Sequence, residues 1–188
     1  LFSRVHIPKR VPLVTAIHSP TGLQLQLYCG DGLPSSIEYI SSYFSEYPTI
    51  RPLYMAVRVI LEAQGMLGAH RSSIRSSALL MLLVAFLKMN HGRFQRTETL
   101  GEQLLAFLHT YGTSVDLTTT GVAVDPPGFF NADSLEDGDS DGEFPSAQLR
   151  GQQSLINIKN TAARRRNFPT ARRLCIQDPS NYMIDIGR

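Results

Sequence analysis

The sequence lacks several features by which protein classes are commonly identified. It has only two cysteines, Cys29 and Cys175, so it can form neither a disulfide framework nor a C-x-x-C metal pair, and a reducing compartment is favoured. The longest apolar run, ALLMLLVAFL at residues 78–87, would reach only about 15 Å as a helix, roughly half of a bilayer core. This run therefore predicts a buried core helix. No secretory signal is visible.

Common catalytic and metal-binding motifs are also missing. The histidines show no metal-ligand spacing, and neither a glycine-rich phosphate loop nor a G-x-S-x-G elbow is present. Asp137, Asp139 and Asp141 match the opening of an EF-hand loop, but Gln148 replaces the bidentate glutamate and Pro145 interrupts the loop. We therefore expect a solvated acidic loop here and no bound metal.

The charge is unevenly distributed, although the net charge is only +2. An acidic, patternless stretch at residues 131–153 reads as a mobile loop or linker, and a basic segment at residues 159–173 follows it. The basic segment could clamp a phosphate backbone, or it could be a solvated linker beside an acidic one. Its arginines are Arg164, Arg165, Arg166, Arg172 and Arg173.

Hydrophobic periodicity predicts a hairpin at residues 11–29 and four helices after it. In TGLQLQLYC, Leu23, Leu25 and Leu27 alternate with Gln24 and Gln26, which is typical of a half-buried strand with a polar face. The predicted helices cover residues 34–48, 51–67, 72–90 and 97–112. The third is apolar nearly all round, which predicts that it lies at the centre of the core.

Details of the helices follow from capping and spacing. Ser35 with Glu38, and Thr99 with Glu102, predict two capping boxes, and Gly112 is a natural C-cap. We expect residues 115–124 to form a short extended pair. The residues expected to face the core on the second and fourth helices are Leu53, Val57, Ile60, Leu61, Leu100, Leu104, Phe107, Leu108 and Tyr111.

The order of these segments resembles a known family. RPLYMAVRVILEAQGML, SSIRSSALLMLLVAFLKMN, LGEQLLAFLHTYG, LTTTGVAV and a closing LCIQDPSNYMIDIGR are similar, in that order, to the central and PAP-associated region of noncanonical poly(A) polymerases and terminal uridylyltransferases. These enzymes belong to the DNA polymerase β-like nucleotidyltransferase superfamily. The resemblance runs from about Val11 to Arg188, with the acidic stretch as an insertion.

The resemblance implies an α+β fold that is mainly α-helical, with a small β-sheet, like the nucleotidyltransferase central helical domain. We expect three regions along the chain. Residues 1–131 are the helical domain with its hairpin, residues 132–160 are the acidic flexible insertion, and residues 161–188 are the basic segment and closing motif, which return to the same domain.

The resemblance also implies where catalytic groups should stand. The family keeps its third carboxylate on the strand after the T-G turn, and Gln26 matches that position, with Gln24 beside it. An amide offers one weak oxygen ligand and cannot act as a base, whereas two-metal phosphoryl transfer needs carboxylates. The resemblance implies that the family's G-S motif and D-x-D pair, which hold two metal ions, belong to an N-terminal catalytic sheet outside the region matched here. We expect no catalytic residue, and Mg²⁺ or Mn²⁺ only if an N-terminal catalytic domain exists.

The family's nucleotide contacts are only partly kept. Arg58 matches the first of two triphosphate-binding lysines, whereas Glu62 matches the second and would repel phosphate. Ser76 matches a triphosphate-contacting serine, but Ser77 replaces a base-stacking aromatic residue. In the closing motif Asp178, Pro179 and Asp185 match, but Ile184 replaces a base-reading asparagine. The remaining nucleotide contacts implied are Arg58, Ser76 and Asp185.

The sequence therefore predicts a degenerate, catalytically inactive poly(A) polymerase-like domain that binds RNA or belongs to a ribonucleoprotein or RNA-processing assembly. One alternative is the C-terminal part of an active RNA nucleotidyltransferase whose catalytic domain is absent from this chain. Another is a purely structural module. We expect no membrane partner, no DNA specificity, and an intracellular location in which nucleus and mitochondrion both stay open.

Overall fold

The computed structural model describes residues 2–6, 13–28, 35–67, 73–94, 99–134, 145–167 and 174–187. The chain divides into two compact units, Leu1–Glu38 and Tyr39–Arg188. The predicted mainly helical α+β class is confirmed. The division into residues 1–131, 132–160 and 161–188 as domains stays a prediction.

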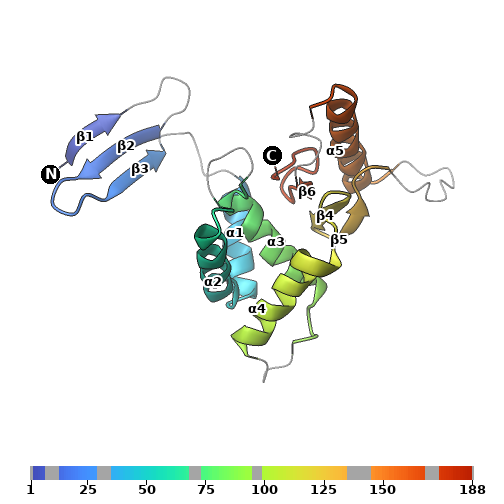
Figure 1. The fold of residues 1–188 in the computed structure, drawn as a ribbon, viewed down its shortest axis with the longest axis horizontal. Coiled ribbons are helices and arrows are strands. Elements are labelled where there is room, and N and C mark those ends of the chain that lie inside the picture. The colour runs from blue at the N-terminus through green and yellow to red at the C-terminus, as the bar shows by residue number, and fades with distance from the viewer. Residues whose placement is uncertain are drawn as a thin grey trace. The chain divides into compact units, whose positions relative to one another are not determined.

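The first unit contains an antiparallel sheet, called here the N-terminal sheet, with strands in the order β1-β2-β3 (Figure 1). Its strands are β1 (Phe2–His6), β2 (Leu13–His18) and β3 (Gln24–Tyr28). The predicted hairpin is confirmed as β2 and β3, and Gly22 has the positive φ of 69° that its turn requires. The sequence does not predict β1, because its two apolar residues, Phe2 and Val5, are three apart and do not show the two-residue spacing of a strand.

The core of the second unit forms around α3 (Ser76–Met89). Nine of its residues are buried, which confirms the prediction of a central helix. It packs against α2 (Ile50–Ala63) and against the second sheet, described below. Helix α1 (Ser35–Glu46) and helix α4 (Leu100–His109) add apolar side chains to the same core. The side chain of Ser35 lies outside the described part, so its predicted capping box stays a prediction.

Helix α4 begins as predicted and ends differently. Glu102 N–H donates to Thr99 Oγ1 at 3.4 Å and Thr99 N–H donates to Glu102 Oε2 at 2.7 Å, which confirms the capping box. The predicted C-cap at Gly112 is wrong, because the chain continues into a π-helical turn, η1 (Thr110–Ser114). The Thr110 hydroxyl donates to the Ala106 carbonyl at 2.8 Å, which satisfies one acceptor at the helix end without a left-handed glycine.

Three finer expectations for the helices are also wrong. Helix α3 begins at Ser76 instead of residue 72, because Ile74 pairs with Leu67 in an isolated bridge. Ile60 is exposed near the C-terminal end of α2, and Leu100 is exposed as the first residue of α4. At these helix ends the apolar stripes extend beyond the residues that the core covers.

The second sheet has the order β5-β4-β6, from β4 (Thr120–Val124), β5 (Pro127–Asn131) and β6 (Ile176–Gln177). The expected extended pair within residues 115–124 is wrong, because β4 pairs with β5, which follows it. The preceding residues form a turn in which Asp116 Oδ1 accepts from the Thr118 N–H at 2.9 Å and from its hydroxyl at 2.6 Å.

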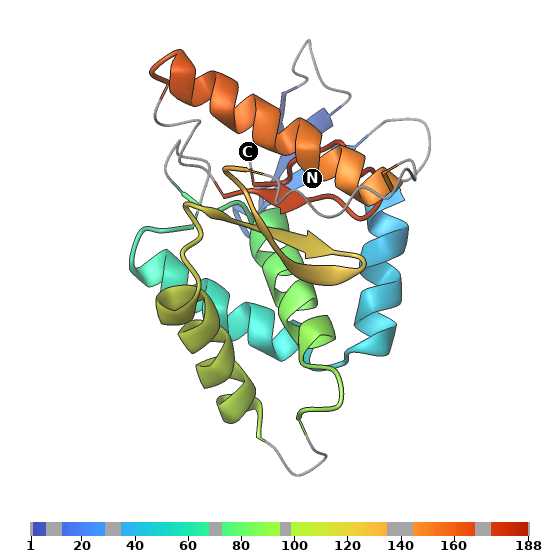
Figure 2. The ribbon, with the colours of Figure 1, turned by 90° about the vertical axis from the view of Figure 1, so that its right-hand side faces the viewer.

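Helix α5 (Ala147–Arg164) covers the second sheet, which lies between α5 and α3 in the views of Figures 1 and 2. The expectation of a linker through residue 160 is therefore wrong from residue 147. Ser146 Oγ accepts from the Leu149 N–H at 3.2 Å and caps the helix, whose buried Leu155 packs with Phe130 of β5. Within the described ranges, no helix is long and apolar enough to cross a membrane.

Candidate nucleic-acid interface

The closing motif folds into a turn that its own aspartates fix. Asp185 Oδ1 accepts from the Ile176 N–H at 3.0 Å and from the Gly187 N–H at 2.9 Å. Asp178 Oδ1 accepts from the N–H and hydroxyl of Ser180, at 2.8 and 2.6 Å. In this structure both aspartates therefore hold the backbone of residues 176–187, which we call the closing turn. The role of Asp185 in nucleotide binding stays a prediction.

The closing turn is locked to α5 by a close approach at Gly151. A Cβ atom at Gly151 would lie 2.2 Å from the Tyr182 carbonyl oxygen, so only glycine fits. The buried Gln177 reinforces the contact, because its Nε2 donates to the Gln148 carbonyl at 2.9 Å and to the Tyr182 carbonyl at 3.0 Å. The position of the turn is thus set by α5, and the two form one surface.

The inner face of α5 holds a buried cation. Lys159 Nζ pairs with Asp133 Oδ1 at 3.1 Å and donates a short hydrogen bond to the Thr118 carbonyl. The Asp133 carboxylate neutralises the charge of Lys159, and the bond to Thr118 connects α5 to the segment that precedes β4. Lys159 is therefore not available to bind phosphate, although it belongs to the basic segment of the sequence.

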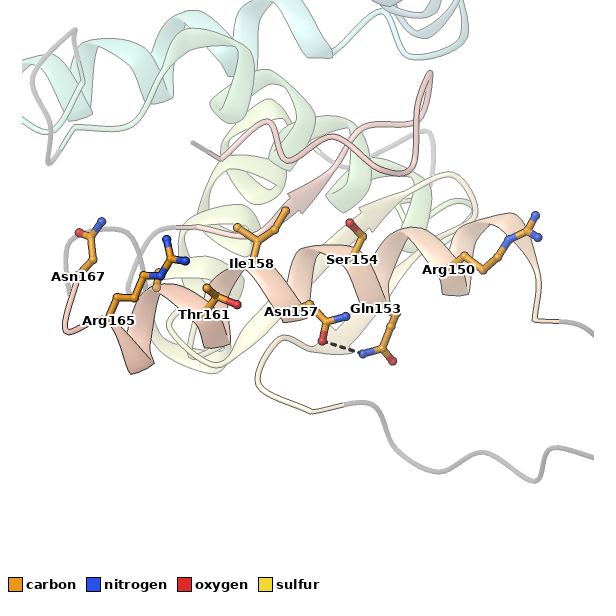
Figure 3. Close-up of a pocket in the computed structure, with 9 residues that line it drawn as sticks. Arg150, Gln153, Ser154, Asn157, Ile158, Thr161, Arg165 and Asn167 are labelled. Atoms are coloured by element: carbon orange, nitrogen blue, oxygen red, sulfur yellow. Dashed lines mark hydrogen bonds between the residues drawn. The ribbon is translucent and has the colours of Figure 1, made fainter.

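The outer face of α5 lines an open groove of about 600 Å³, the α5 groove (Figure 3). Its polar lining comes from one stripe of the helix, with Arg150 near one end and Arg165 near the other. Gln153 Nε2 donates to Asn157 Oδ1 at 3.2 Å between them. The polar side chains of the stripe are Arg150, Gln153, Ser154, Asn157, Thr161 and Arg165.

A second depression of about 400 Å³ lies where α5 begins, between Arg150 and the closing turn. Ser180, Asn181 and Tyr182 of the closing turn line its other side. Arg150 borders both depressions, so the groove and the closing turn meet at this guanidinium.

Arginines gather at the C-terminal end of α5. Arg164 is its last residue, Arg165 its C-cap, and Arg166 has a positive φ of 54° as the chain leaves the helix. All three side chains are exposed, and we call them the arginine cluster. The helix carries no acidic residue. The other two predicted arginines, Arg172 and Arg173, lie outside the described residues.

The predicted nucleotide contacts are in different places. Arg58 lies on α2, where its Nε pairs with Glu62 Oε1 at 2.7 Å, and this hydrogen bond raises the pKa of Arg58. In this structure the Arg58 guanidinium is therefore paired with the Glu62 carboxylate. Ser76 is exposed at the start of α3. Within the described part of the chain, no hydrogen bond or ion pair joins Arg58, Ser76 and Asp185, and their role in nucleotide binding stays a prediction.

Gln26, which the resemblance matches to the family's third carboxylate, lies on β3 of the N-terminal sheet, and this match stays a prediction. Gln26 pairs with Thr15 of β2, and its side chain lies outside the described part. The expected half-buried face is instead exposed in Leu23, Leu25 and Leu27, at 63 %, 41 % and 57 %. Across the described ranges, no group of three or more His, Cys, Asp or Glu residues could hold a metal ion. Residues 137–141, which resemble an EF-hand loop, are outside those ranges.

Sequence reasoning identified the arginine cluster but missed the rest of the α5 groove. The sequence predicts a linker over Arg150, Gln153 and Asn157, and it indicates no role for Thr161. A signal was available, because these residues recur three or four apart and continue to Arg165. A serine cap before this stretch and the absence of acids within it were further indications.

Comparison with known proteins finds a curated relative and several solved structures that are similar to this chain. No family model matches the chain. A poly(A) RNA polymerase, cid14 of Schizosaccharomyces pombe, is 26 % identical over 95 residues, covering 48 % of this chain and 14 % of that protein. The polymerase core of TRAMP, an RNA surveillance complex, has a TM-score of 0.69 at 18 % identity and covers 100 % of this chain and 53 % of its own.

Two further solved structures are similar. Terminal uridylyl transferase 4 from Trypanosoma brucei with bound UPU has a TM-score of 0.63 at 18 % identity, covering 98 % of this chain and 60 % of that one. The apo form of mtPAP has a TM-score of 0.56 at 18 % identity, covering 90 % and 49 %. The fold is therefore similar to that of about half of each of these structures, and the resemblance to noncanonical poly(A) polymerases and terminal uridylyltransferases is confirmed. The chain spans about half the length of these solved structures.

Proposed function

We propose that this chain is a degenerate, catalytically inactive poly(A) polymerase-like domain that binds RNA. The observation that carries the proposal is the arginine cluster, three consecutive exposed arginines at the end of a helix without acidic residues. The fold supports an RNA-related role, and Gln26 at the family's carboxylate position supports the loss of catalysis. We further propose that the protein acts inside the cell as a component of a ribonucleoprotein or RNA-processing assembly.

Binding and catalysis make different demands on this fold. Phosphoryl transfer needs carboxylates that hold divalent ions, and a glutamine cannot replace them. Contacts to the RNA backbone need only positive charge and hydrogen-bond donors, which the arginine cluster supplies. Such binding is little dependent on sequence and is steeply weakened by salt, because each neutralised phosphate releases counterions.

Single-stranded RNA titrated at two salt concentrations tests the proposal. Replacing Arg164, Arg165 and Arg166 with alanine should weaken the affinity and flatten the salt slope by up to about 2 units, the value for three lost single-strand phosphate contacts. The matched control replaces Arg51, Arg75 and Arg93 with alanine, which removes the same three charges at exposed positions outside α5. An unchanged affinity and slope in the triple variant would show that the arginines contact protein or solvent instead.

The exposed leucine face of β3 favours a second candidate, the C-terminal part of an active RNA nucleotidyltransferase. A sheet face of this kind is normally covered by further protein. The two candidates differ in a primer-extension assay with oligo(A), each nucleoside triphosphate, and Mg²⁺ or Mn²⁺. We expect no ladder from this chain, and none from Gln26→Asp. Extension by this chain would refute the inactive assignment, and extension only by a longer form of the protein would establish the second candidate.

A further inference from the structure

We propose that the α5 groove is a track for the phosphodiester backbone of single-stranded RNA, with Arg150 as an anchor at the opposite end from the arginine cluster. This inference rests on the proposed RNA-binding function and extends it to residues that the sequence did not identify. It places RNA along the outer face of α5, from the C-terminal arginines to the closing turn.

The geometry of the stripe defines the track. Arg150, Asn157 and Arg165 lie on the same outer face of α5, as Figure 3 shows. Fifteen residues separate the two arginines, which corresponds to roughly 22 Å along the helix axis. The inner face is held by the buried Leu155 and Ile156, so α5 cannot rotate without losing its core contacts. The outer stripe is thus presented on a fixed element.

The chemistry of the stripe matches a polyanion rich in hydroxyl groups. Two guanidinium groups, each a rigid set of donors suited to phosphate, stand at its ends. Between them Gln153, Asn157 and Thr161 offer neutral amides and a hydroxyl, which can donate to phosphate oxygens or pair with the ribose 2′-hydroxyl. No carboxylate on α5 opposes an anion, and Lys159, on the inner face, is already neutralised by Asp133.

The lining disfavours an amphipathic helix and a lipid surface. Two apolar side chains, Ile158 and Ala162, line the groove, which is too few to bury the apolar face of either. An acidic peptide could satisfy the arginines with its carboxylates and the neutral donors with its backbone carbonyls. RNA is preferred because the inference rests on the proposed RNA-binding function, and an acidic peptide is one outcome of the test below. The second depression continues the groove past Arg150 to Asn181 and Tyr182, so an extended RNA strand has a path beyond the Arg150 end of the stripe.

Labelled single-stranded oligo(A) titrated against the full chain tests this track. Arg150→Ala should weaken the affinity and lower the salt slope by about 0.7 units, the value for one lost single-strand phosphate contact, and Arg150→Lys should retain most of the slope. Arg93→Ala, an exposed arginine after α3, is the matched control and should bind like the unchanged chain. Circular dichroism melts verify that each variant is folded.

A charge placed at the middle of the stripe gives an independent measurement. Asn157→Glu should weaken binding at least as strongly as Arg150→Ala, because it puts a carboxylate in the path of the phosphates. Gln64→Glu makes the same change of net charge at an exposed position after α2 and should have little effect. Equal weakening by both would show that only net charge matters, which would overturn the track.

The outcomes separate the two levels of the proposal. If the arginine-cluster triple variant loses affinity while Arg150→Ala and Asn157→Glu bind normally, the track is wrong and the proposed function stands. If the unchanged chain binds no RNA, the proposed function fails and the track fails with it. If an oligoglutamate peptide displaces the RNA and itself loses affinity in both single variants, the groove is a site for acidic peptides instead.

Discussion

Two tyrosines of the second unit, the buried Tyr43 and the partly buried Tyr111, differ in one contact. The Tyr111 hydroxyl donates to the Leu82 carbonyl at 3.1 Å, whereas the Tyr43 hydroxyl is buried and has no hydrogen-bond partner among the described residues. Burial raises the pKa of both side chains above the ordinary value of 10.0, and at Tyr43 the nearby Asp125 carboxylate adds to the shift. A net hydrogen bond contributes about 0.5–1.5 kcal/mol, and an unpaired buried hydroxyl costs free energy.

Replacing each tyrosine with phenylalanine should therefore have opposite consequences at neutral pH. Tyr111→Phe should lower the free energy of unfolding by about 1 kcal/mol, because the Leu82 carbonyl loses its donor. Tyr43→Phe should leave the stability unchanged or raise it slightly, since no bond is lost and the Lys88 ammonium, 5.2 Å from the ring centroid, keeps an aromatic partner. Urea unfolding at pH 7 measures both, and equal losses would contradict the assignment.

The same pair predicts a dependence on alkaline pH. A tyrosine whose folded pKa is raised binds its proton more tightly in the folded state than in the unfolded chain. The associated stability is complete below pH 10, the unfolded pKa, and is lost as the pH rises through the folded value. We expect the free energy of unfolding to fall above pH 10, and Tyr111→Phe to flatten this fall. A slope in the variant equal to that of the unchanged chain would contradict this expectation.

At the level of the elements, two helical glycines offer a matched comparison. A Cβ atom at Gly151 of α5 would lie 2.2 Å from the Tyr182 carbonyl, whereas one at Gly101 of α4 would meet only Thr99 Oγ1 at an ordinary 3.6 Å. Alanine is a better helix former than glycine by up to about 1 kcal/mol. Gly101→Ala should therefore stabilise the protein by up to about 1 kcal/mol.

Gly151→Ala should instead destabilise the protein by about 1–3 kcal/mol, because backbone must move to admit the methyl group. The closing turn should also loosen, which faster amide exchange at residues 176–187 would report. Calorimetric melts of the two variants give the comparison. If Gly151→Ala stabilised the protein as much as Gly101→Ala does, the close approach of α5 and the closing turn would be wrong.

The elements also show which features were predictable from the sequence. Helix α3 was predictable because a helix that is apolar on every face is stable only when it is buried on every face. The start of α4 was predictable because Thr99 and Glu102 form a local capping box. Helix α5 was missed because only a few of its residues are apolar, and the acidic stretch before it suggested a linker. The strand β6 has two residues and depends on β4 for its conformation, so no local pattern encodes it.

In the candidate site, too, features encoded by a local run of residues were predictable, and features that depend on tertiary contacts were not. The arginine cluster was visible as a run in the sequence, and the structure adds that it is exposed at the end of α5. The α5 groove could not be found while its residues were assigned to a linker. The roles of Asp178 and Asp185 in holding the closing turn were not visible either, since they depend on hydrogen bonds to backbone N–H groups that the folded turn brings together.

At the level of the whole molecule, the two units have very different cores. The main core cluster is built from residues between Tyr39 and Ile186, and among the described residues none before Tyr39 contributes to it. In the N-terminal sheet, Ala16 is the only described hydrophobic side chain that is buried, and three leucines of β3 are exposed. A small sheet needs a buried apolar face to be stable by itself. We therefore expect the stability of this chain to come from the second unit.

Deletion of residues 1–34, which keeps α1 complete, tests this expectation. The remaining fragment, residues 35–188, should unfold cooperatively in urea with a free energy of unfolding within about 0.5 kcal/mol of the full chain, as for changes that leave the core intact.

The isolated peptide 1–34 should show no strand signal by circular dichroism, because its leucines have nothing to cover them. A loss of several kcal/mol on deletion would instead show that the N-terminal sheet packs on the helical unit and buries Leu23, Leu25 and Leu27 there. A strand signal in the isolated peptide would contradict the view that this sheet requires further protein.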